Sequence, residues 1–297
     1  MRINPNMVPD VLAAIYATQS QQETALQELS TGKRVNTPAD DPLAAALMVG
    51  NQDQTSRTDQ YLQNIDTLTN QMQSADTALS SVVTALNQAI TLGVEGANGT
   101  NTAAQRQQIA QNLQGIQAQI LQLANTSIGG TFLFGGTATT TTPFVLDSSS
   151  PSGVTYNGNN GTNSVEIADG LMVQTNLPGS DLFQNANGDV FGSLLQLINA
   201  LQTGTSSDVA TATNAVRDAY TLVTGKRIFY GNVENQVNST QTYLNQEKVN
   251  LKSQENTLIG ADITKAATDL TQATTAHNAA LAAAAKILPT SLLDYLK

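Results

Sequence analysis

The side chains that could carry out chemistry are few and scattered along the chain. There is a single histidine, His277, and there is no cysteine, so thiolate metal sites and thiol nucleophiles are excluded. The positions four residues before and after His277 are Ala273 and Leu281, neither of which can be a second metal ligand. His277 also falls on the apolar face of a helical pattern. We therefore interpret it as a packing residue within a helical interface.

Two further groups of residues resemble sites only superficially. Asp40 and Asp41 are adjacent carboxylates, but Pro38 and Pro42 flank them just before a helical pattern, which favours a turn and a helix cap, with a subunit contact as the alternative. A partial calcium-loop pattern at residues 185–189 lacks its first acidic ligand, and no acidic residue closes it. The sequence therefore predicts no catalytic, metal-binding or cofactor-binding residue, and we expect the protein not to be an enzyme.

Charge excludes two classes of partner. The chain has 13 basic and 23 acidic residues, a net charge of -10 and a pI near 4.4, with no Lys or Arg between Arg106 and Arg217. Nucleic acids and anionic membranes both require a clustered basic surface, so we expect neither as a partner. The N-terminus has no apolar run typical of a cleaved signal peptide, and no apolar stretch approaches the roughly 20 residues that span a bilayer.

The elements that must position any functional surface are helices at the two ends of the chain. At each end, apolar residues recur in alternating steps of four and three, which is a heptad pattern. We expect the two helices to pair. Polar residues such as Gln19, Gln22 and His277 interrupt both patterns, so the pair should leave apolar surface for neighbouring chains. The predicted assembly residues are Val8, Leu12, Ile15, Leu26, Leu29, Ile263, Leu270, His277 and Ile287.

The segments next to these ends form a longer helical body. Gly32 should end the first helix, and Asp41 should cap a second that has Pro42 in its first turn. Unbroken heptad spacing from Tyr61 to Ala89 predicts a long helix, and a third helix should start at Thr100 or Thr102, with its apolar face running from Ile109 to Leu123. We interpret these two apolar faces as the internal core of a helical bundle.

A β-rich insertion interrupts the helices. Short β-type runs, separated by turn clusters, lie between residues 131 and 173, and five of the six phenylalanines lie between Phe132 and Phe191, so we expect a small separate core. Helical periodicity then returns from Phe191 through Val209, with a bend or restart expected between Gly225 and Gly231. We predict a terminal domain (1–42 with 260–297), a helical rod (43–130 with 191–259) and a β-rich outer domain (131–190).

Two groups of residues resemble a known family. At the N-terminal end these are Ser30, Gly32, Arg34, Pro38, Asp40, Asp41 and Pro42. At the C-terminal end they are Leu292, Leu293 and Tyr295, preceded by the run from Ala261 to Leu270. Together they resemble the flagellin-like axial proteins of the bacterial flagellum, and the two prolines that flank the Asp pair resemble the hook-filament junction members of that family. The resemblance covers roughly the first 140 and the last 90 residues.

The resemblance implies a mainly α, elongated flagellin-like rod of long helices, with paired terminal coiled-coil helices and a small β-rich inserted domain. It also implies a structural subunit that forms a ring on hook-associated protein 1 and presents the lattice for flagellin. Export through the flagellar type III apparatus with a chaperone, and an extracellular location, are carried over in the same way. Two alternatives remain: a flagellin that builds the filament itself, and a secreted enzyme on a helical scaffold.

Overall fold

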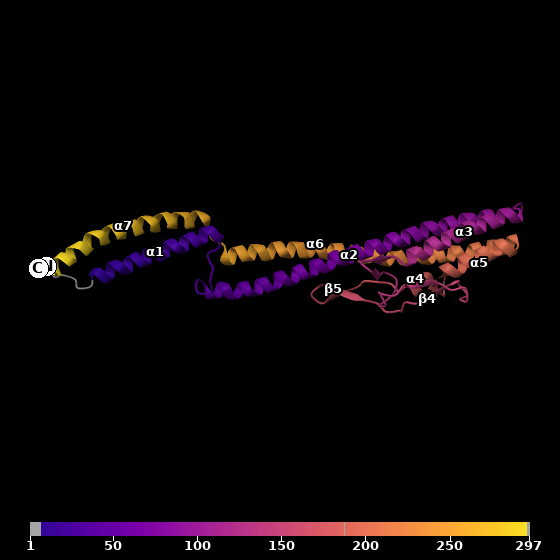
Figure 1. The fold of residues 1–297 in the computed structure, drawn as a ribbon, viewed down its shortest axis with the longest axis horizontal. Helices are drawn as coiled ribbons and strands as arrows, with labels where there is room; N and C mark the ends of the chain where they lie inside the picture. The colour runs from indigo at the N-terminus through magenta and orange to yellow at the C-terminus, as the bar shows by residue number, and fades with distance from the viewer. Residues whose placement is uncertain (1–6, 187, 296–297) are drawn as a thin grey trace. The chain divides into compact units, whose positions relative to one another are not determined.

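The computed structural model describes the backbone of residues 7–186 and 188–295 and the side chains of residues 9–186 and 188–286 (Figure 1). The fold is mainly α-helical, with a small β-containing region, as predicted. It divides into two compact units, one made of Met1–Thr58 and Gln246–Lys297 and the other of Asp59–Asn245. The three-part domain division predicted from the sequence remains a proposal.

The first unit contains two complete helices and the ends of two longer ones. α1 (Met7–Thr31) and α7 (Ile263–Tyr295) are complete, whereas α2 (Pro42–Gly96) enters the unit with its first turns and α6 (Ser206–Ile259) with its last. α1 ends as predicted at Gly32, whose φ of 68° suits a residue without a Cβ. The predicted cap of α2 is also confirmed, because the Ala44 N–H donates to Asp41 Oδ1 at 3.0 Å.

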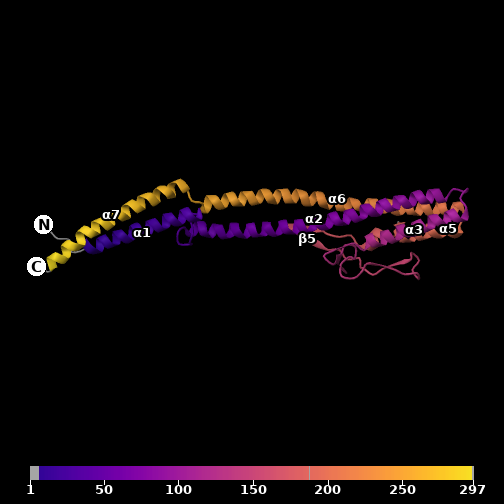
Figure 2. The same cartoon turned by 45° about the horizontal axis from the view of Figure 1, so that its top comes forward.

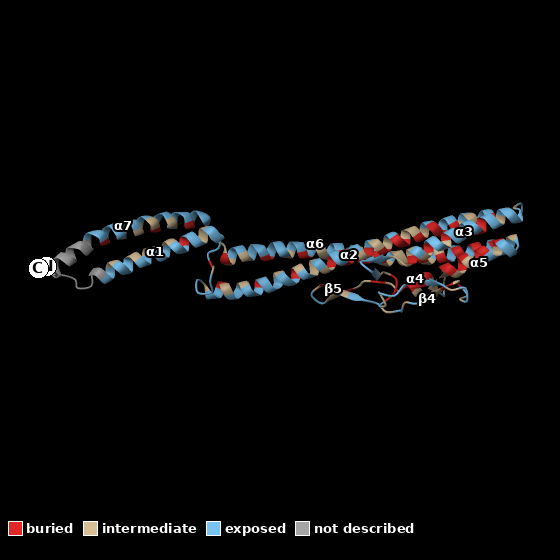
Figure 3. Cartoon of the chain, in the orientation of Figure 1, coloured by how far each residue is buried: buried red, intermediate tan, exposed pale blue. Residues whose placement is uncertain are grey.

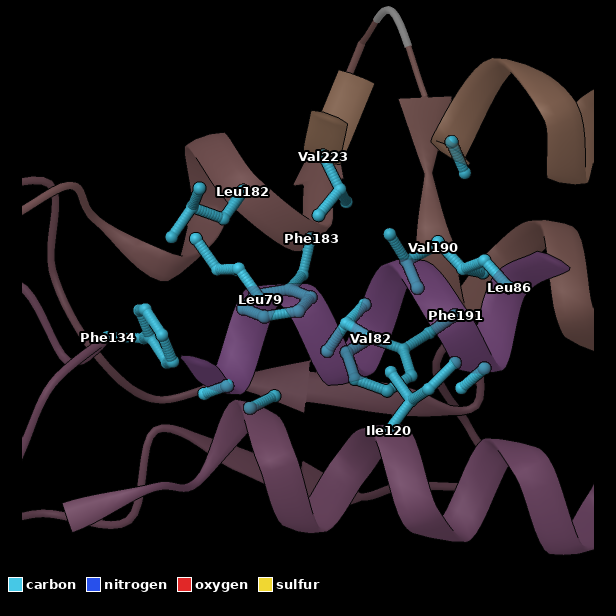
Figure 4. Packing of buried hydrophobic residues seen from close by; sticks show 14 of the residues in the cluster. Leu79, Val82, Leu86, Ile120, Phe134, Leu182, Phe183, Val190, Phe191 and Val223 are labelled. Carbon is cyan, nitrogen blue, oxygen red and sulfur yellow. The ribbon is translucent and has the colours of Figure 1, made fainter. Parts of the chain in front are cut away.

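The second unit is a helical bundle around one apolar core (Figure 4). The predicted face of α2 is buried from Ile65 to Ala89 at every heptad position, and Tyr61 is half-buried. α3 (Ala103–Ala124) starts at a capping box made by Thr102 and Gln105, and it buries Ile109, Leu113, Ile116 and Ile120. α5 (Val190–Thr203) packs against α3. Both predicted apolar faces are therefore core, as expected.

The β region consists of four antiparallel two-stranded hairpins. They are β1 (Ser127–Ile128) with β2 (Thr131–Phe132), β3 (Phe144–Leu146) with β4 (Val154–Tyr156), β5 (Ser164–Ala168) with β6 (Leu171–Gln174), and β7 (Gln184–Asn185) with β8 (Gly188–Asp189). The short helix α4 (Gly179–Phe183) precedes the last hairpin.

The expectation of a separate core for this region is wrong. The Phe183 ring lies 5.6 Å from that of Phe134 and 5.2 Å from that of Phe144, and all three side chains belong to the same buried cluster as Leu79 and Leu86 of α2 (Figure 4). The physical reason is size: isolated two-stranded hairpins cannot bury a core of their own and need a helix to pack against.

Two helix boundaries also differ from expectation. α6 continues from Ser206 to Ile259 without a break at Gly225 or Gly231. The periodic run after Phe191 is instead divided at Gly204, after which Thr205 and Asp208 form a reciprocal cap for α6, with the Thr205 N–H 2.8 Å from Asp208 Oδ2. A polar turn with its own cap therefore ends the helix here, even though the apolar spacing continues across it. The expectation that no stretch is apolar enough to span a bilayer does not hold for α2, which passes this test by length and composition alone. Core helices of soluble proteins pass the same test.

Candidate assembly surface

The two terminal helices lie side by side and run in opposite directions (Figures 1 and 2). Small side chains line their contact: Ala25 of α1 and Ala266, Ala273 and Ala284 of α7 are buried. Around them lie half-buried residues of both helices, namely Val11, Ile15, Thr18, Gln22, Leu29, Leu270, His277 and Ala280. The predicted pairing of the ends is therefore confirmed, and the contact is thin, because its buried side chains are alanines. Most of the described length of both helices is coloured exposed or intermediate in Figure 3.

His277 lies within this contact. Its Nδ1 is 3.1 Å from Thr18 Oγ1, across the gap between α7 and α1. Thr18 Oγ1 also lies 3.0 Å from the backbone carbonyl oxygen of Ala14 and 2.9 Å from that of Ile15, to which its hydroxyl can donate. Among the described residues, no group of three His, Cys, Asp or Glu side chains could hold a metal ion.

The contact uses a different register on α1 from the predicted one. The residues that face α7 are Val11, Ile15, Thr18, Gln22, Ala25 and Leu29, whereas the predicted Leu12 and Leu26 are 48% and 56% exposed. Both sets have four-three spacing and share three positions, so spacing alone could not choose between them. Thr18 and Ala25 allow a closer approach of the helices than leucines would, and this favours the observed register.

Other predicted assembly residues have mixed placements. Leu270 and His277 lie in the contact, but Ile263 is 50% exposed, because α7 begins just before the contact does. The side chains of Val8 and Ile287 lie outside the described residues, as do those of the family-signature residues Leu292, Leu293 and Tyr295. No observation tests the assembly role itself, which remains a proposal.

The two linkers that lead into the terminal helices are joined to each other. The Arg34 N–H donates to the carbonyl of Ile259 at 2.7 Å, and the Ala261 N–H donates to that of Gly32 at 3.0 Å. The Arg34 guanidinium donates to Asp41 Oδ2 at 3.0 Å and to the carbonyl of Leu258 at 3.1 Å. We call residues 32–41 with 258–262 the joint. Sequence reasoning missed this pairing, because no local signal links segments so far apart.

Carboxylates order the N-terminal side of the joint. Asp40 Oδ2 accepts the backbone N–H groups of Asn36 and Thr37 at 2.9 and 2.8 Å. These hydrogen bonds, that of Thr37 first, lower the pKa of Asp40, and the bond from the Ala44 N–H followed by that from Arg34 lowers the pKa of Asp41. The Asp pair therefore serves as turn and cap, as its flanking prolines predicted. Ser30 and Pro38 are exposed at its edge.

A small apolar cluster lies beneath the joint. Val35, Ala44 and Ile259 are buried together, with Met48 and Leu258 packed against them. Val35, Leu258 and Ile259 belong to the joint itself, so the joint is packed as well as hydrogen-bonded. This arrangement holds and orders the chain segments that lead to the terminal helices.

Comparisons with known proteins agree with this geometry. The family model for the bacterial flagellin N-terminal helical region matches residues 3–139, and that for the C-terminal helical region matches residues 213–296. Flagellar hook-associated protein 3 of Salmonella typhimurium is 34% identical over 146 residues, which are 48% of this chain and 46% of that protein. Flagellin A of Vibrio cholerae is 32% identical over 142 residues, 46% of this chain and 37% of that protein. The chain therefore matches about half the length of these relatives or less.

A solved structure shows the same fold. It is described as a flagellar hook-associated protein from Vibrio parahaemolyticus, with a TM-score of 0.69 and 23% sequence identity, and the match covers 74% of this chain and 99% of that one. The mainly α, flagellin-like architecture is thus shared with a solved protein at low sequence identity.

Proposed function

The chain belongs to the flagellin-like family of bacterial axial proteins, and from this premise we propose that it is a structural subunit of the flagellum that forms the junction ring between hook-associated protein 1 and the flagellin filament. The ring consists of identical copies, each of which contributes its terminal helices. The subunit catalyses nothing and needs no cofactor. It acts outside the cell after export through the flagellar type III apparatus, with a chaperone.

The observation that carries the proposal is the incomplete burial of the α1–α7 pair. Its buried side chains are alanines and its larger side chains are only half-buried, while Leu12, Tyr16 and Leu26 remain exposed. A two-helix contact of this kind gains little burial energy against the entropy of ordering the helices. Burial between neighbouring copies would supply the missing stabilisation, so assembly and ordering of the ends would be coupled.

The joint supports the same mechanism. It fastens the first residues after α1 to the last residues before α7 through backbone and side-chain hydrogen bonds. When one terminal helix is ordered, the joint therefore also fixes the position of the first residues of the other helix. The two helices can then bind a neighbouring subunit together, as one pair.

A flagellin that builds the filament is the second candidate, and the similarity to Flagellin A of Vibrio cholerae favours it. We prefer the junction role because Pro38 and Pro42 flank the Asp pair. A secreted enzyme is disfavoured because no group of three His, Cys, Asp or Glu side chains among the described residues could hold a metal ion.

The test is electron microscopy of a strain in which the gene is deleted. We expect intact hooks without filaments, together with unpolymerised flagellin in the medium. Hooks without filaments and without released flagellin would favour the flagellin alternative, and normal filaments would refute both structural roles. Complementation with the wild-type gene should restore filaments.

A further inference from the structure

The α1–α7 pair has two chemically different sides. Five large apolar side chains of the pair are exposed: Leu12, Tyr16, Leu26, Ile263 and Leu281, with exposures from 45% to 64%. An α-helix turns about 100° per residue, which puts Leu12, Tyr16 and Leu26 about 60–140° around α1 from the centre of its contact with α7. Ile263 and Leu281 are rotated in the same sense around α7. Because the two helices run in opposite directions, the five side chains face the same side of the pair.

The other side of the pair is polar. An open groove of about 420 Å³ runs there between the helices, lined by Gln21, Thr24 and Glu28 of α1 and by Asp269 and Gln272 of α7, among others. These residues are rotated from the contact in the opposite sense to the apolar ones, which confirms the separation of the two sides. We call the side with Leu12, Tyr16, Leu26, Ile263 and Leu281 the apolar face.

The apolar face has the dimensions of a protein contact. From Leu12 to Leu26 it is about 21 Å long at 1.5 Å per residue, and it is two helices wide. An anionic membrane is a poor occupant, because the described part of the pair has four acidic residues, including Glu23 within the stripe on α1, against Lys265 and Lys286. Exposed apolar surface of this extent on a soluble protein indicates a protein partner.

Charge and side-chain size favour α7 of a second copy as that partner. The charged residues of α1 are all acidic, namely Asp10, Glu23 and Glu28, so α1 against α1 would bring like charges together. The described part of α7 carries Lys265 and Lys286 against the single acidic residue Asp269, so it is net positive where α1 is net negative. The outward side of α7 presents small exposed residues at seven-residue spacing: Thr268, Thr275 and Ala282. Small side chains leave room for Leu12, Tyr16 and Leu26 to pack close to the α7 backbone.

We propose that the apolar face of the α1–α7 pair receives the outer side of α7, marked by Thr268, Thr275 and Ala282, from a second copy of this chain. The inference rests on the proposed function and specifies its subunit contact. α1 then has two heptad faces about one residue apart, one for its own α7 and one for the neighbour's. Two different surfaces meet, so each copy can bind a further copy, and such head-to-tail contacts generate rings or helical assemblies.

The chain has no cysteine, so single-cysteine variants carry one reactive thiol each. We would co-express Tyr16→Cys with Thr268→Cys, Thr275→Cys or Ala282→Cys beside the wild-type chain, isolate assembled flagella and treat them with a short bismaleimide. At least one combination should give a covalent dimer. The matched control is Gln21→Cys, which is exposed on the polar side of the same helix, and it should give none in the same three combinations.

Three results would overturn the inference: equal dimer from Gln21→Cys, dimer from Tyr16→Cys alone, which indicates an α1–α1 contact, or no dimer from any combination in flagella that contain the variants. If the Tyr16→Cys variant does not enter flagella but the Gln21→Cys variant does, the inference is supported, because assembly then depends on the apolar face and not on the polar side. Normal filaments in the deletion strain would refute the proposed function itself, whereas crosslinks on another face refute only this inference.

Discussion

The Arg34 guanidinium donates from a single nitrogen to Asp41 Oδ2 at 3.0 Å and to the carbonyl oxygen of Leu258 at 3.1 Å. It thereby connects the cap of α2 to the end of α6, segments more than 200 residues apart in the sequence. The carbonyl contact gives Arg34 a role that an isolated surface ion pair does not have, because it fixes the backbone at the point where α7 must start.

Replacement of Arg34 by Ala should loosen the joint without unfolding the protein. Exposed ion pairs contribute roughly 0.2–1 kcal/mol, and Arg34 is half exposed, so global stability should change little. Limited proteolysis should instead cut faster within residues 32–41 and 258–262. Arg57→Ala, which removes an exposed ion pair with Asp53 within α2, is the control and should leave the cleavage rate unchanged. Equal acceleration in both variants would contradict a specific role for Arg34.

Acid should weaken the same joint. The folded-state pKa values of Asp40 and Asp41 lie below the ordinary 3.8, mainly because backbone N–H groups donate to the carboxylates. A depressed carboxyl pKa stabilises the folded state above the unfolded value, and this stabilisation is lost as the pH falls through the folded pKa. Amide hydrogen exchange should therefore accelerate at Asn36, Thr37 and Ala44 below pH 3.8 before it does in the core helices. Protection at Ala44 that is unaffected by acid would count against this reading.

Asp189 should show the opposite sign. Burial raises its pKa, while its side chain caps α5 by accepting the Gly192 N–H at 2.9 Å. A raised carboxyl pKa means that ionisation costs stability at neutral pH, so stability should increase as the pH falls towards that pKa. Asp189→Asn keeps an acceptor and should be at least as stable as the wild type at pH 7 in urea denaturation, whereas Asp189→Ala should lose about 1 kcal/mol. Equal losses in both variants would show that the charge itself stabilises the cap.

Leu270 tests the assembly mechanism. It lies half-buried in the α1–α7 contact, and Leu270→Asp would place a carboxylate there, at a cost of several kcal/mol once neighbouring copies exclude water. We expect hooks without filaments and flagellin in the medium, provided that the variant is exported. The purified variant should keep the thermal transition of the second unit, which does not contain residue 270. Normal filaments with exported variant would show that the terminal helices are not the assembly element.

The aromatic cluster should dominate the stability of the second unit. Phe183 is fully buried against Phe134, Phe144 and Phe191, so Phe183→Ala should cost about 3–5 kcal/mol in chemical denaturation. Leu146 is 68% exposed on β3, and Leu146→Ala is the control, with an expected change within about 0.5 kcal/mol. Comparable losses in the two variants would mean that the hairpins pack differently from the structure shown in Figure 4.

The sequence alone determined several elements that depend on local periodicity and capping, although it missed the break at Gly204 and the cap that Thr205 and Asp208 form for α6. The face of α2 from Ile65 to Ala89, the Asp41 cap with Pro42 in the first turn, and the stop at Gly32 follow from side chains close together along the chain, and all were confirmed.

Where two sets of residues have equally good helical spacing, only the tertiary structure decides which set is buried. Leu12 and Leu26 fit the heptad period of α1 as well as Thr18 and Ala25 do, and only the presence of α7 determines which set is buried. The joint between Arg34 and Leu258 and the merging of the Phe183 cluster with the α2 core likewise depend on contacts between distant segments. Periodicity predicts that a helix has a buried face. Which residues form that face depends on the partner helix and on how closely the two helices can approach.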